Sequence, residues 1–540
     1  MSAVAGKLES LGWWERWGIY AIAAILCACA WHTLSASRYP ANLPRAGEPL
    51  GRQRFSLRTI WRYYRDCRSL YHEVYEKYSK RRRTVLVPGF GARNEIIMPQ
   101  SAMRWVFSQP EEKLSHVEAF LDLNQSHYSL GTTKFVADGW QGELVRTQLN
   151  AVLENVCSAM NDELGAAFDQ CFGTDTDGWK EVDLLANIRM VVGQAASRFT
   201  VGLPLCRDKQ YLKDSFQMVD RLVLNAGLTG ACPLVLRPIV GRLVCSGMTT
   251  IVERIKKALA PTYRDRLEII QAAEDQAVPE PSDHLQMMLR FAKSQRPQEL
   301  HDLDAITRRI IVANFASMHQ TAMQVTNLLI NILDSDKEFN TIAILRDEAT
   351  RIVGSRTDGT QPAWTKTKVS QLIRADSAAR ETLRLHSFGN RSVFRKVMVD
   401  DLVTEDGIKL PKGAMLSFLG YPPQTEHEMY DDPLKYDPFR FSRAREAAAD
   451  AGGRPGLSNL SFVSTSPQHL PFSHGKHACP GRFLIDFEMK MVLAYVLMNY
   501  DIEFPNEYQG KRPPQRWMAE ATVPPPGVKL RVRRRKGTFN

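Results

Sequence analysis

The pattern of apolar and polar positions divides the chain into three regions. Residues 17–37 contain no Asp, Glu, Lys or Arg and are rich in Ala, Ile, Leu and Cys. About 20 such residues span a bilayer as a helix, so we expect a membrane anchor over residues 1–37. Residues 38–54 are rich in Pro, Gly and Arg without an apolar period, which is typical of a hinge. Residues 55–540 are expected to form the remaining domain.

The middle of the chain predicts a mainly helical domain. Between residues 100 and 390, apolar residues recur three and four positions apart, as in 143–160 and 180–200. The longest such run extends from Ala305 to Asp334 without Pro or Gly. A helix of that length measures about 45 Å and must cross the interior of a large domain. Strand-like alternation is confined to the short segments 84–87, 393–399, 408–417 and 528–533. The predicted fold class is therefore mainly α with a small β portion.

The flanks of the apolar segment predict its orientation. Glu9 and Glu15 precede it, which argues against the basic region of a cleaved signal peptide. Arginines at 38, 45, 52, 54 and 58 follow it, and the positive-inside rule then places the rest of the chain in the cytosol. The nine cysteines include no CxxC pair, which agrees with a reducing compartment.

The charge of the chain favours acidic partners. Lys and Arg number 70 and Asp and Glu 59, which gives a formal net charge of +11. Basic runs at 80–83 and 531–536 lack a recognisable nucleic-acid-binding fold, so we expect no nucleic-acid partner. In an anchored protein such runs are more consistent with contact to lipid headgroups.

Near the C-terminus, Cys479 precedes an apolar-periodic segment in the sequence FSHGKHACPGR, residues 472–482. We expect a helix that starts at Pro480, whose dipole and free N–H groups would stabilise a thiolate. Gly475 and Gly481 would let a flat cofactor approach the backbone. Such a thiolate is a suitable axial ligand for haem iron.

Two other interpretations of Cys479 remain at this point. A lone cysteine is often a buried structural residue. A zinc site with His474 and His477 is also conceivable, although it lacks a fourth ligand and the usual paired spacing.

The same segment resembles a known family at every fixed position of its motif. FSHGKHACPG is similar to the cysteine haem loop of the cytochromes P-450, FxxGxxxCxG, with Phe472, Gly475, Cys479 and Gly481 at the fixed positions. Upstream, Glu381-Thr-Leu-Arg384 resembles the ExxR motif and the segment containing Arg440 resembles PxRF. The chain is thus identified as a member of this family. The resemblance implies the cytochrome P-450 fold and haem b bound through the Cys479 thiolate.

The resemblance also implies roles for other side chains. Glu381, Arg384 and Arg440 would form a buried charged triad behind the haem, because buried charges persist only when paired. Haem propionates are carboxylates and need cationic partners, ideally Arg or protonated His. By motif position, His477 resembles the residue that binds them. Arg395, in the strand after ExxR, resembles another, and Arg146, in the helical segment ELVRTQLN, is a candidate for a third.

The long apolar segment falls where the family has its oxygen-activating helix, but its motif departs from (A/G)Gx(D/E)T. Here the sequence is ASMHQT, residues 316–321. His319 takes the place of the acid and Gln320 that of the threonine, with Thr321 one position later. A glutamine amide does not relay protons readily, but His319 can titrate near neutrality and Thr321 could take over the hydroxyl role. We expect at least one of His319, Gln320 and Thr321 to affect the coupling of electrons to product. In the alternative, all three merely line the helix, and water or the substrate delivers the protons.

The family resemblance implies a monooxygenase that uses O2 and NADPH-derived electrons from NADPH-cytochrome P-450 reductase, with cytochrome b5 as a further partner. It implies a single-pass protein of the endoplasmic reticulum with a cytosolic catalytic domain. The loop style is similar to fungal ent-kaurene and gibberellin oxidases, which suggests an apolar terpenoid, polyketide or indole substrate from secondary metabolism. A redox-neutral rearrangement, dehydration or ring coupling, a non-catalytic haem sensor and a structural membrane protein remain alternatives.

Overall fold

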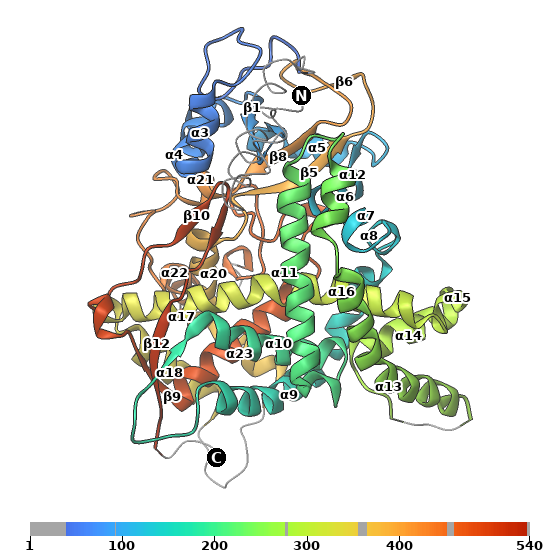
Figure 1. Cartoon of the computed structure of the whole chain (residues 1–540). Helices are drawn as coiled ribbons and strands as arrows, with labels where there is room; N and C mark the ends of the chain where they lie inside the picture. Colours follow the sequence, from blue (N-terminus) through green and yellow to red (C-terminus); the bar gives the residue numbers. More distant parts are fainter. Residues whose placement is uncertain (1–38, 92, 276–278, 355–363, 451–457, 537–540) are drawn as a thin grey trace, which may run out of the picture.

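The computed structural model describes residues 39–91, 93–275, 279–354, 364–450 and 458–536. Helices make up the larger part of the molecule, and a five-stranded sheet lies at one end of it beside the N-terminal helices (Figure 1). The mainly helical architecture with a small β portion confirms the fold class that the sequence predicts.

Long helices form the centre of the helical part. They are α9 (Trp140–Cys171), α10 (Leu184–Thr200), α16 (Leu303–Ser317), α17 (His319–Phe339), α20 (Ile373–His386) and α23 (Arg482–Asn499). Nearly every residue of α23 from Leu484 onwards is buried. A helix that is apolar on all sides is stable only inside a core, so α23 lies against several other helices and fixes the position of the loop before it.

Shorter and peripheral helices surround this centre. They are α3 (Leu57–Arg65), α4 (Cys67–Val74), α5 (Met103–Ser108), α6 (His116–Asn124), α7 (Ser126–Ser129), α8 (Lys134–Ala137), α11 (Lys209–Ala231), α12 (Arg237–Val244), α13 (Met248–Asp275), α14 (His284–Gln295), α15 (Pro297–Leu300), α18 (Thr341–Val353), α19 (Lys366–Ser370), α21 (Tyr421–Gln424) and α22 (Arg440–Asp450).

The main sheet has the strand order β1-β2-β8-β5-β3. Its strands are β1 (Val85–Pro88), β2 (Asn94–Ile97), β3 (Leu114–Ser115), β5 (Arg391–Val397) and β8 (Met415–Leu419). The register of β5 against β8 shifts between Ser392 and Arg395, and Val393 in this bulge has a φ of 57°. A bulge redirects the side chains that follow it, and Arg395 comes two residues later.

Smaller sheets complete the β portion. One joins β4 (Lys180–Asp183), β12 (Lys529–Arg534) and β9 (Tyr500–Glu503), and two hairpins pair β6 (Leu402–Val403) with β7 (Lys409–Leu410) and β10 (Arg516–Met518) with β11 (Ala521–Val523).

The long helix predicted from Ala305 to Asp334 is interrupted once. The structure forms α16 and α17 with Met318 between them. Met318 is buried, its N–H donates to the Asn314 carbonyl at 3.0 Å, and its own carbonyl accepts the N–H of Ala322 at 3.1 Å. The interruption falls inside the unusual segment 316–321, and apolar periodicity gives no signal for it because both sides keep the same buried face.

Other predicted boundaries also differ. Residues 180–183 form β4 instead of the first turn of a helix. The predicted strand 408–417 is divided into β7 and β8. The helix α23 starts at Arg482, two residues after Pro480. Pro480 therefore lies before the helix, and Gly481 is its N-terminal cap residue.

The expected membrane anchor at residues 17–37 lies outside the described residues. Among the residues that are described, none of the helices combines the length and apolar character needed to cross a bilayer. The stretch 38–54 was expected to be a hinge. Within it, Leu43 and Ala46 are buried, and the backbone of Arg45 forms an isolated β-bridge with that of Leu86 in β1. This part of the stretch packs against the sheet.

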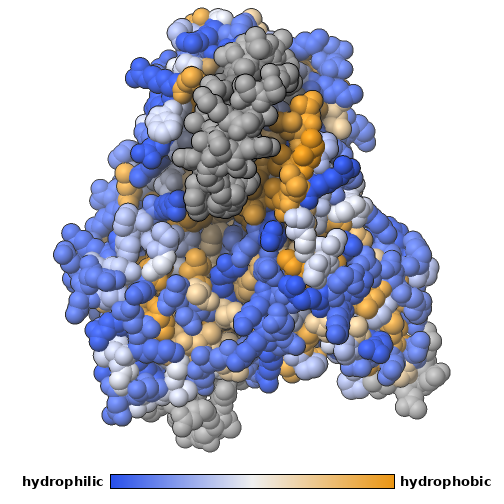
Figure 2. Space-filling view, viewed as in Figure 1, coloured by the Kyte–Doolittle hydropathy of each residue, from blue (hydrophilic) through white to orange (hydrophobic). Residues whose placement is uncertain are grey.

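Exposed apolar side chains gather on the end of α11 and on α12 (Figure 2). We call this region the α11–α12 apolar surface, and it consists of Leu224, Leu228, Leu234, Val235, Leu236, Ile239 and Leu243.

Candidate functional site

The loop before α23 holds Cys479 in a defined turn. The N–H of Cys479 donates to the Phe472 carbonyl at 2.8 Å, and that of Ala478 donates to the Gly475 carbonyl at 3.0 Å. Gly475 has a φ of 70°, and a Cβ atom there would lie 3.0 Å from the ring of Phe107. Glycine satisfies both the left-handed backbone and the close approach, which explains why this position carries no side chain.

The surroundings of Cys479 suit a thiolate ligand. The backbone N–H groups of Gly481 and Arg482 donate toward the sulfur and lower the pKa of the thiol, whereas burial raises it and prevails. A Cβ at Gly481 would lie 4.0 Å from Sγ, so the space beside the sulfur stays open. With no cation bound, burial favours the neutral thiol, and a bound metal cation would stabilise the charged form.

Three side chains with N–H donors converge beside the cysteine loop. The rings of His477 and His116 stack with centroids 4.5 Å apart, and Arg395 Nη1 lies 3.3 Å from His116 Nδ1. Burial and the neighbouring Arg395 lower the pKa of both histidines, that of His477 to about 4. Arg395 Nη2 and His477 Nε2 are buried without a hydrogen-bond partner.

Such a cluster of unpartnered donors fits an anion. Buried polar groups are usually hydrogen-bonded, and groups that lower one another's pKa are stabilised by a negative charge. A carboxylate placed here would accept from Arg395 and His477. The cluster therefore fits the carboxylates of a haem whose iron is bound by Cys479. His477 is neutral at pH 7 in this structure, so it would act as an N–H donor there.

Arg146 lies differently from the other two expected partners. Its side chain is exposed and forms an ion pair with Glu143 on the same helix at 2.5 Å. Its one contact with the cysteine loop is a bond from Nη1 to the Lys476 carbonyl at 3.4 Å.

His116 is a site residue that the sequence did not reveal. It is the first residue of α6, and a single histidine in a polar segment gives no signal of its own. The Glu111 carboxylate holds it in place by accepting the backbone N–H of His116 at 2.7 Å.

The charged triad is fully assembled. Arg384 donates to both carboxylate oxygens of Glu381 at 2.7 Å, and Arg440 Nε donates to Glu381 Oε1 at 3.0 Å. Glu381 and Arg384 are completely buried. Arg384 also donates to the carbonyls of Gln424 and Pro433 at 2.7 and 2.6 Å. The triad thus joins α20, the start of α22 and the loop between them behind the cysteine loop.

The segment at the junction of α16 and α17 borders open space, which we call the hollow. Ala316, one residue before the end of α16, and Gln320, the second residue of α17, are both exposed. Positions i and i+4 share one face of a helix, so this face borders open space. His319 is half-buried, with its ring near that of Phe388 at 6.4 Å, and burial lowers its pKa, so the imidazole is neutral at pH 7.

Thr321 does not share this face. Its side chain is buried, and Oγ1 has no hydrogen-bond partner. Gln320 stands at the position where the family motif has threonine, and it shares the exposed helix face with Ala316.

An apolar cavity of about 280 Å³ lies next to α16, and none of its lining residues belongs to the cysteine loop. Its walls come from α6 to the start of α9, from α11 and from α16. Lining residues include His116, Phe120, Phe135, Leu222, Val312 and Phe315. His116 connects this cavity to the donor cluster, because its ring stacks on that of His477.

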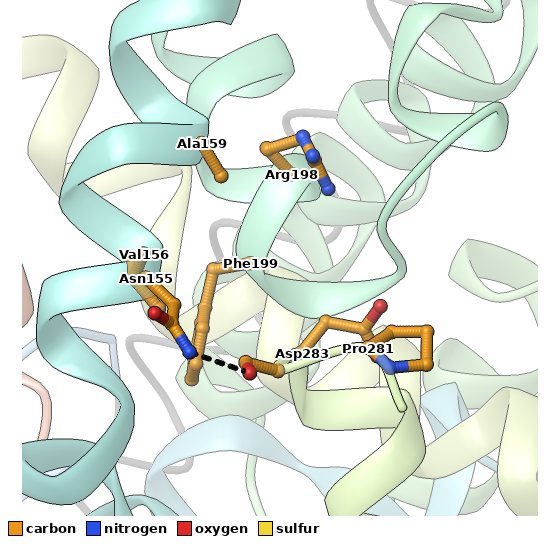
Figure 3. Close-up of a pocket in the computed structure, with 8 residues that line it drawn as sticks. Asn155, Val156, Ala159, Arg198, Phe199, Pro281 and Asp283 are labelled. Carbon is orange, nitrogen blue, oxygen red and sulfur yellow. Dashed lines mark hydrogen bonds between the residues drawn. The ribbon is translucent and has the colours of Figure 1, made fainter. Parts of the chain in front are cut away.

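A second pocket lies away from this site. It holds about 160 Å³ between α9, α10 and residues 281–283, where Asn155 Nδ2 donates to Ser282 Oγ at 3.0 Å (Figure 3). None of its lining residues belongs to α16 or to the donor cluster of His116, His477 and Arg395.

The zinc interpretation finds no support in the geometry. His474 Nδ1 is hydrogen-bonded to Thr465 Oγ1 at 2.8 Å, and His477 stacks on His116. Within the described segments, no three His, Cys, Asp or Glu side chains come together in a way that would hold a metal ion.

The donor cluster yields a prediction about cofactor retention. Arg395→Met should release haem about tenfold faster than wild type, because a buried charge-assisted hydrogen bond is lost. The rate of haem transfer to apomyoglobin measures this. Arg146→Met is the matched control and should change the rate little, since Arg146 is exposed and already paired. Equal effects of the two substitutions would contradict the assignment.

Comparisons with known proteins show the family to which the chain belongs. The family model described as Cytochrome P450 matches residues 42–532. The chain is 53% identical to Cytochrome P450 monooxygenase pbrC of Penicillium brasilianum and to Cytochrome P450 monooxygenase astC of Aspergillus terreus, each over 97% of both chains. It is 43% identical to Cytochrome P450 monooxygenase tenB of Beauveria bassiana over 99% of both.

Proposed function

Because this chain belongs to the cytochrome P450 family and is a P450 monooxygenase, we propose that it inserts one oxygen atom from O2 into an apolar natural product of fungal secondary metabolism. The apolar cavity carries this proposal, because its lining residue His116 stacks on His477 of the cysteine loop. Its lining includes no Asp, Glu, Lys or Arg, which supports a neutral apolar substrate such as a terpenoid, a polyketide or an indole compound.

The residues of the site have distinct parts in this activity. Haem, when bound through the Cys479 thiolate, supplies the activation of O2 and the transfer of one oxygen atom to the substrate. Arg395 and His477 would hold its carboxylates, and Phe472 and Gly481 would border its faces. Phe120, Phe135 and Phe315 would exclude water and hold the substrate.

Proton delivery to the hollow beside Gln320 cannot use the acidic residue of the family motif, because His319 takes its place. The amide of Gln320 accepts and donates hydrogen bonds at Oε1 and Nε2 and can position a water molecule there. The neutral His319 beside it can accept a proton at its free ring nitrogen and release it again. We assign proton delivery to these two residues and to water, and not to the buried hydroxyl of Thr321.

This assignment predicts different effects for neighbouring substitutions. Gln320→Leu should raise the hydrogen peroxide released per NADPH consumed several-fold, because the water in the hollow loses its partner. Thr321→Val should leave this ratio nearly unchanged, since its hydroxyl lies on another face. Peroxide and NADPH are measured with the reductase-coupled enzyme. The reverse order of effects would show that Thr321 delivers the proton.

The electron source and the location follow from the family. We propose that NADPH-cytochrome P450 reductase supplies electrons, with cytochrome b5 as a further donor, and that the net positive charge assists docking of acidic partners. We place the protein on the endoplasmic reticulum with an anchor over residues 1–37, the segment 38–54 after it and a cytosolic catalytic domain over 55–540. The α11–α12 apolar surface supports contact with membrane lipid.

A further inference from the structure

Two parts of the chain meet along one wall of the apolar cavity. One part of this wall is formed by Asn124 at the end of α6 and Ser126 at the start of α7. The adjoining part is formed by Leu222 of α11. We call the contact between α6–α7 and α11 the α6–α11 seam. The shape of the cavity depends on how these parts are held together.

Asn225 lies at the centre of the seam and is completely buried. Its Nδ2 donates to the backbone carbonyls of Asn124 and Gln125 at 3.3 and 3.1 Å. Its Oδ1 accepts the hydroxyl of Thr229, one turn later on α11, at 2.8 Å. Both ends of the amide are thereby used, and Thr229 fixes its orientation.

The Asn124 carbonyl needs an outside partner because α6 ends there, whereas the Gln125 carbonyl also accepts the backbone N–H of Tyr128 at 3.1 Å. The last carbonyls of a helix have no partner within it. Gln125 has a φ of 49°, which turns the chain sharply from α6 into α7. Asn225 thus caps the C-terminus of α6 from another helix, and it contacts the backbone directly before the lining residue Ser126.

Further contacts along the seam lie closer to solvent. Arg237 Nη1 and Asp122 Oδ1 form an ion pair at 2.8 Å between the start of α12 and α6. A Cβ at Gly241 would lie 2.5 Å from the ring of Tyr128, so only glycine lets α12 approach α7 this closely. These contacts bring the α11–α12 apolar surface next to the wall of the cavity.

We propose that Asn225 is a positioning residue for the substrate. By capping α6 it holds the α6–α11 seam closed and fixes the wall formed by Asn124, Ser126 and Leu222. In this way it sets the rate at which bulky ligands enter and leave the cavity. This inference rests on the proposed function, because it takes the apolar cavity as the substrate site. Asn225 does not touch the reacting atoms and acts through the segment that it holds.

The test uses the full-length haem-containing protein and two azoles of different size. Clotrimazole is bulky and apolar and must occupy the cavity, whereas imidazole is small, and both are followed by the spectral change on binding to haem. In Asn225→Leu, clotrimazole should associate and dissociate about tenfold faster, as expected for the loss of buried hydrogen bonds. The association and dissociation rates of imidazole should change by less than about twofold, because imidazole is small.

A second measurement, amide hydrogen exchange, follows the local stability of the α6–α11 seam. Amide hydrogen exchange of residues 116–130 should accelerate in Asn225→Leu, while that of α23 should not. Asn499→Leu is the matched control, since Asn499 is equally buried but lies at the end of α23 and bonds only to the Tyr495 carbonyl at 2.9 Å. It should affect stability without a selective effect on clotrimazole.

Thr229→Val provides a milder change if Asn225→Leu does not fold. It removes only the hydroxyl that orients the amide and should shift clotrimazole kinetics in the same direction by a smaller factor. The proposal is overturned if either folded variant leaves both the exchange of residues 116–130 and the clotrimazole rates at wild-type values. A wild-type protein without haem spectra would refute the proposed function instead, so the two failures are distinguishable.

Discussion

Glu381→Leu is expected to prevent accumulation of folded, haem-loaded protein. The substitution leaves Arg384 completely buried and Arg440 largely buried without their carboxylate. Breaking a buried ion pair by removing one partner costs about 3–5 kcal/mol, and a domain is stable by only about 5–15 kcal/mol in total. Soluble yield and haem content per protein measure the effect.

Glu143→Leu is the matched control for this prediction. Glu143 pairs with Arg146 at the same i, i+3 spacing, but both side chains are exposed, and such surface pairs contribute about 0–1 kcal/mol. This variant should fold and bind haem like wild type. If Glu381→Leu did so as well, the triad would be unnecessary for the structure behind the haem.

Cys479→Ser is expected to fold but to lose the thiolate ligand. Cys479 is half-buried, and its sulfur receives two backbone N–H groups that a serine hydroxyl can also accept. The thermal midpoint should therefore change little, whereas the ferric haem spectrum should shift and NADPH-supported turnover should be abolished. Cys157→Ser is the control, because Cys157 is a buried thiol of α9 away from the loop. That variant should keep both the spectrum and the turnover.

The sequence predicted the parts of the site that depend on short spacing. Glu381 and Arg384 lie one turn apart on a helix, so their contact follows from the helical period alone. The turn from Phe472 to Cys479 follows from two glycines and a following helix. The strands β1 and β12 were found within one residue of the segments 84–87 and 528–533 that the sequence predicted.

The parts that were missed depend on contacts between distant segments. His116 reaches His477 because α6 packs beside the cysteine loop, and no local pattern marks this. Arg146 pairs with Glu143 on the exposed face of α9 and also donates to the Lys476 carbonyl of the cysteine loop, so its contact with a haem carboxylate stays a prediction. The interruption at Met318 likewise leaves the apolar period intact, so only the three-dimensional structure reveals which of Gln320 and Thr321 borders the hollow.

The central claim is that Cys479 provides the thiolate ligand of a haem, and the carbon monoxide difference spectrum of the reduced protein tests it most directly. Only a thiolate-bound haem gives the strongly red-shifted Soret band. We expect wild type and Cys157→Ser to show this band and Cys479→Ser to lack it. A band that persists in Cys479→Ser, or well-folded wild-type protein without haem, would contradict the account.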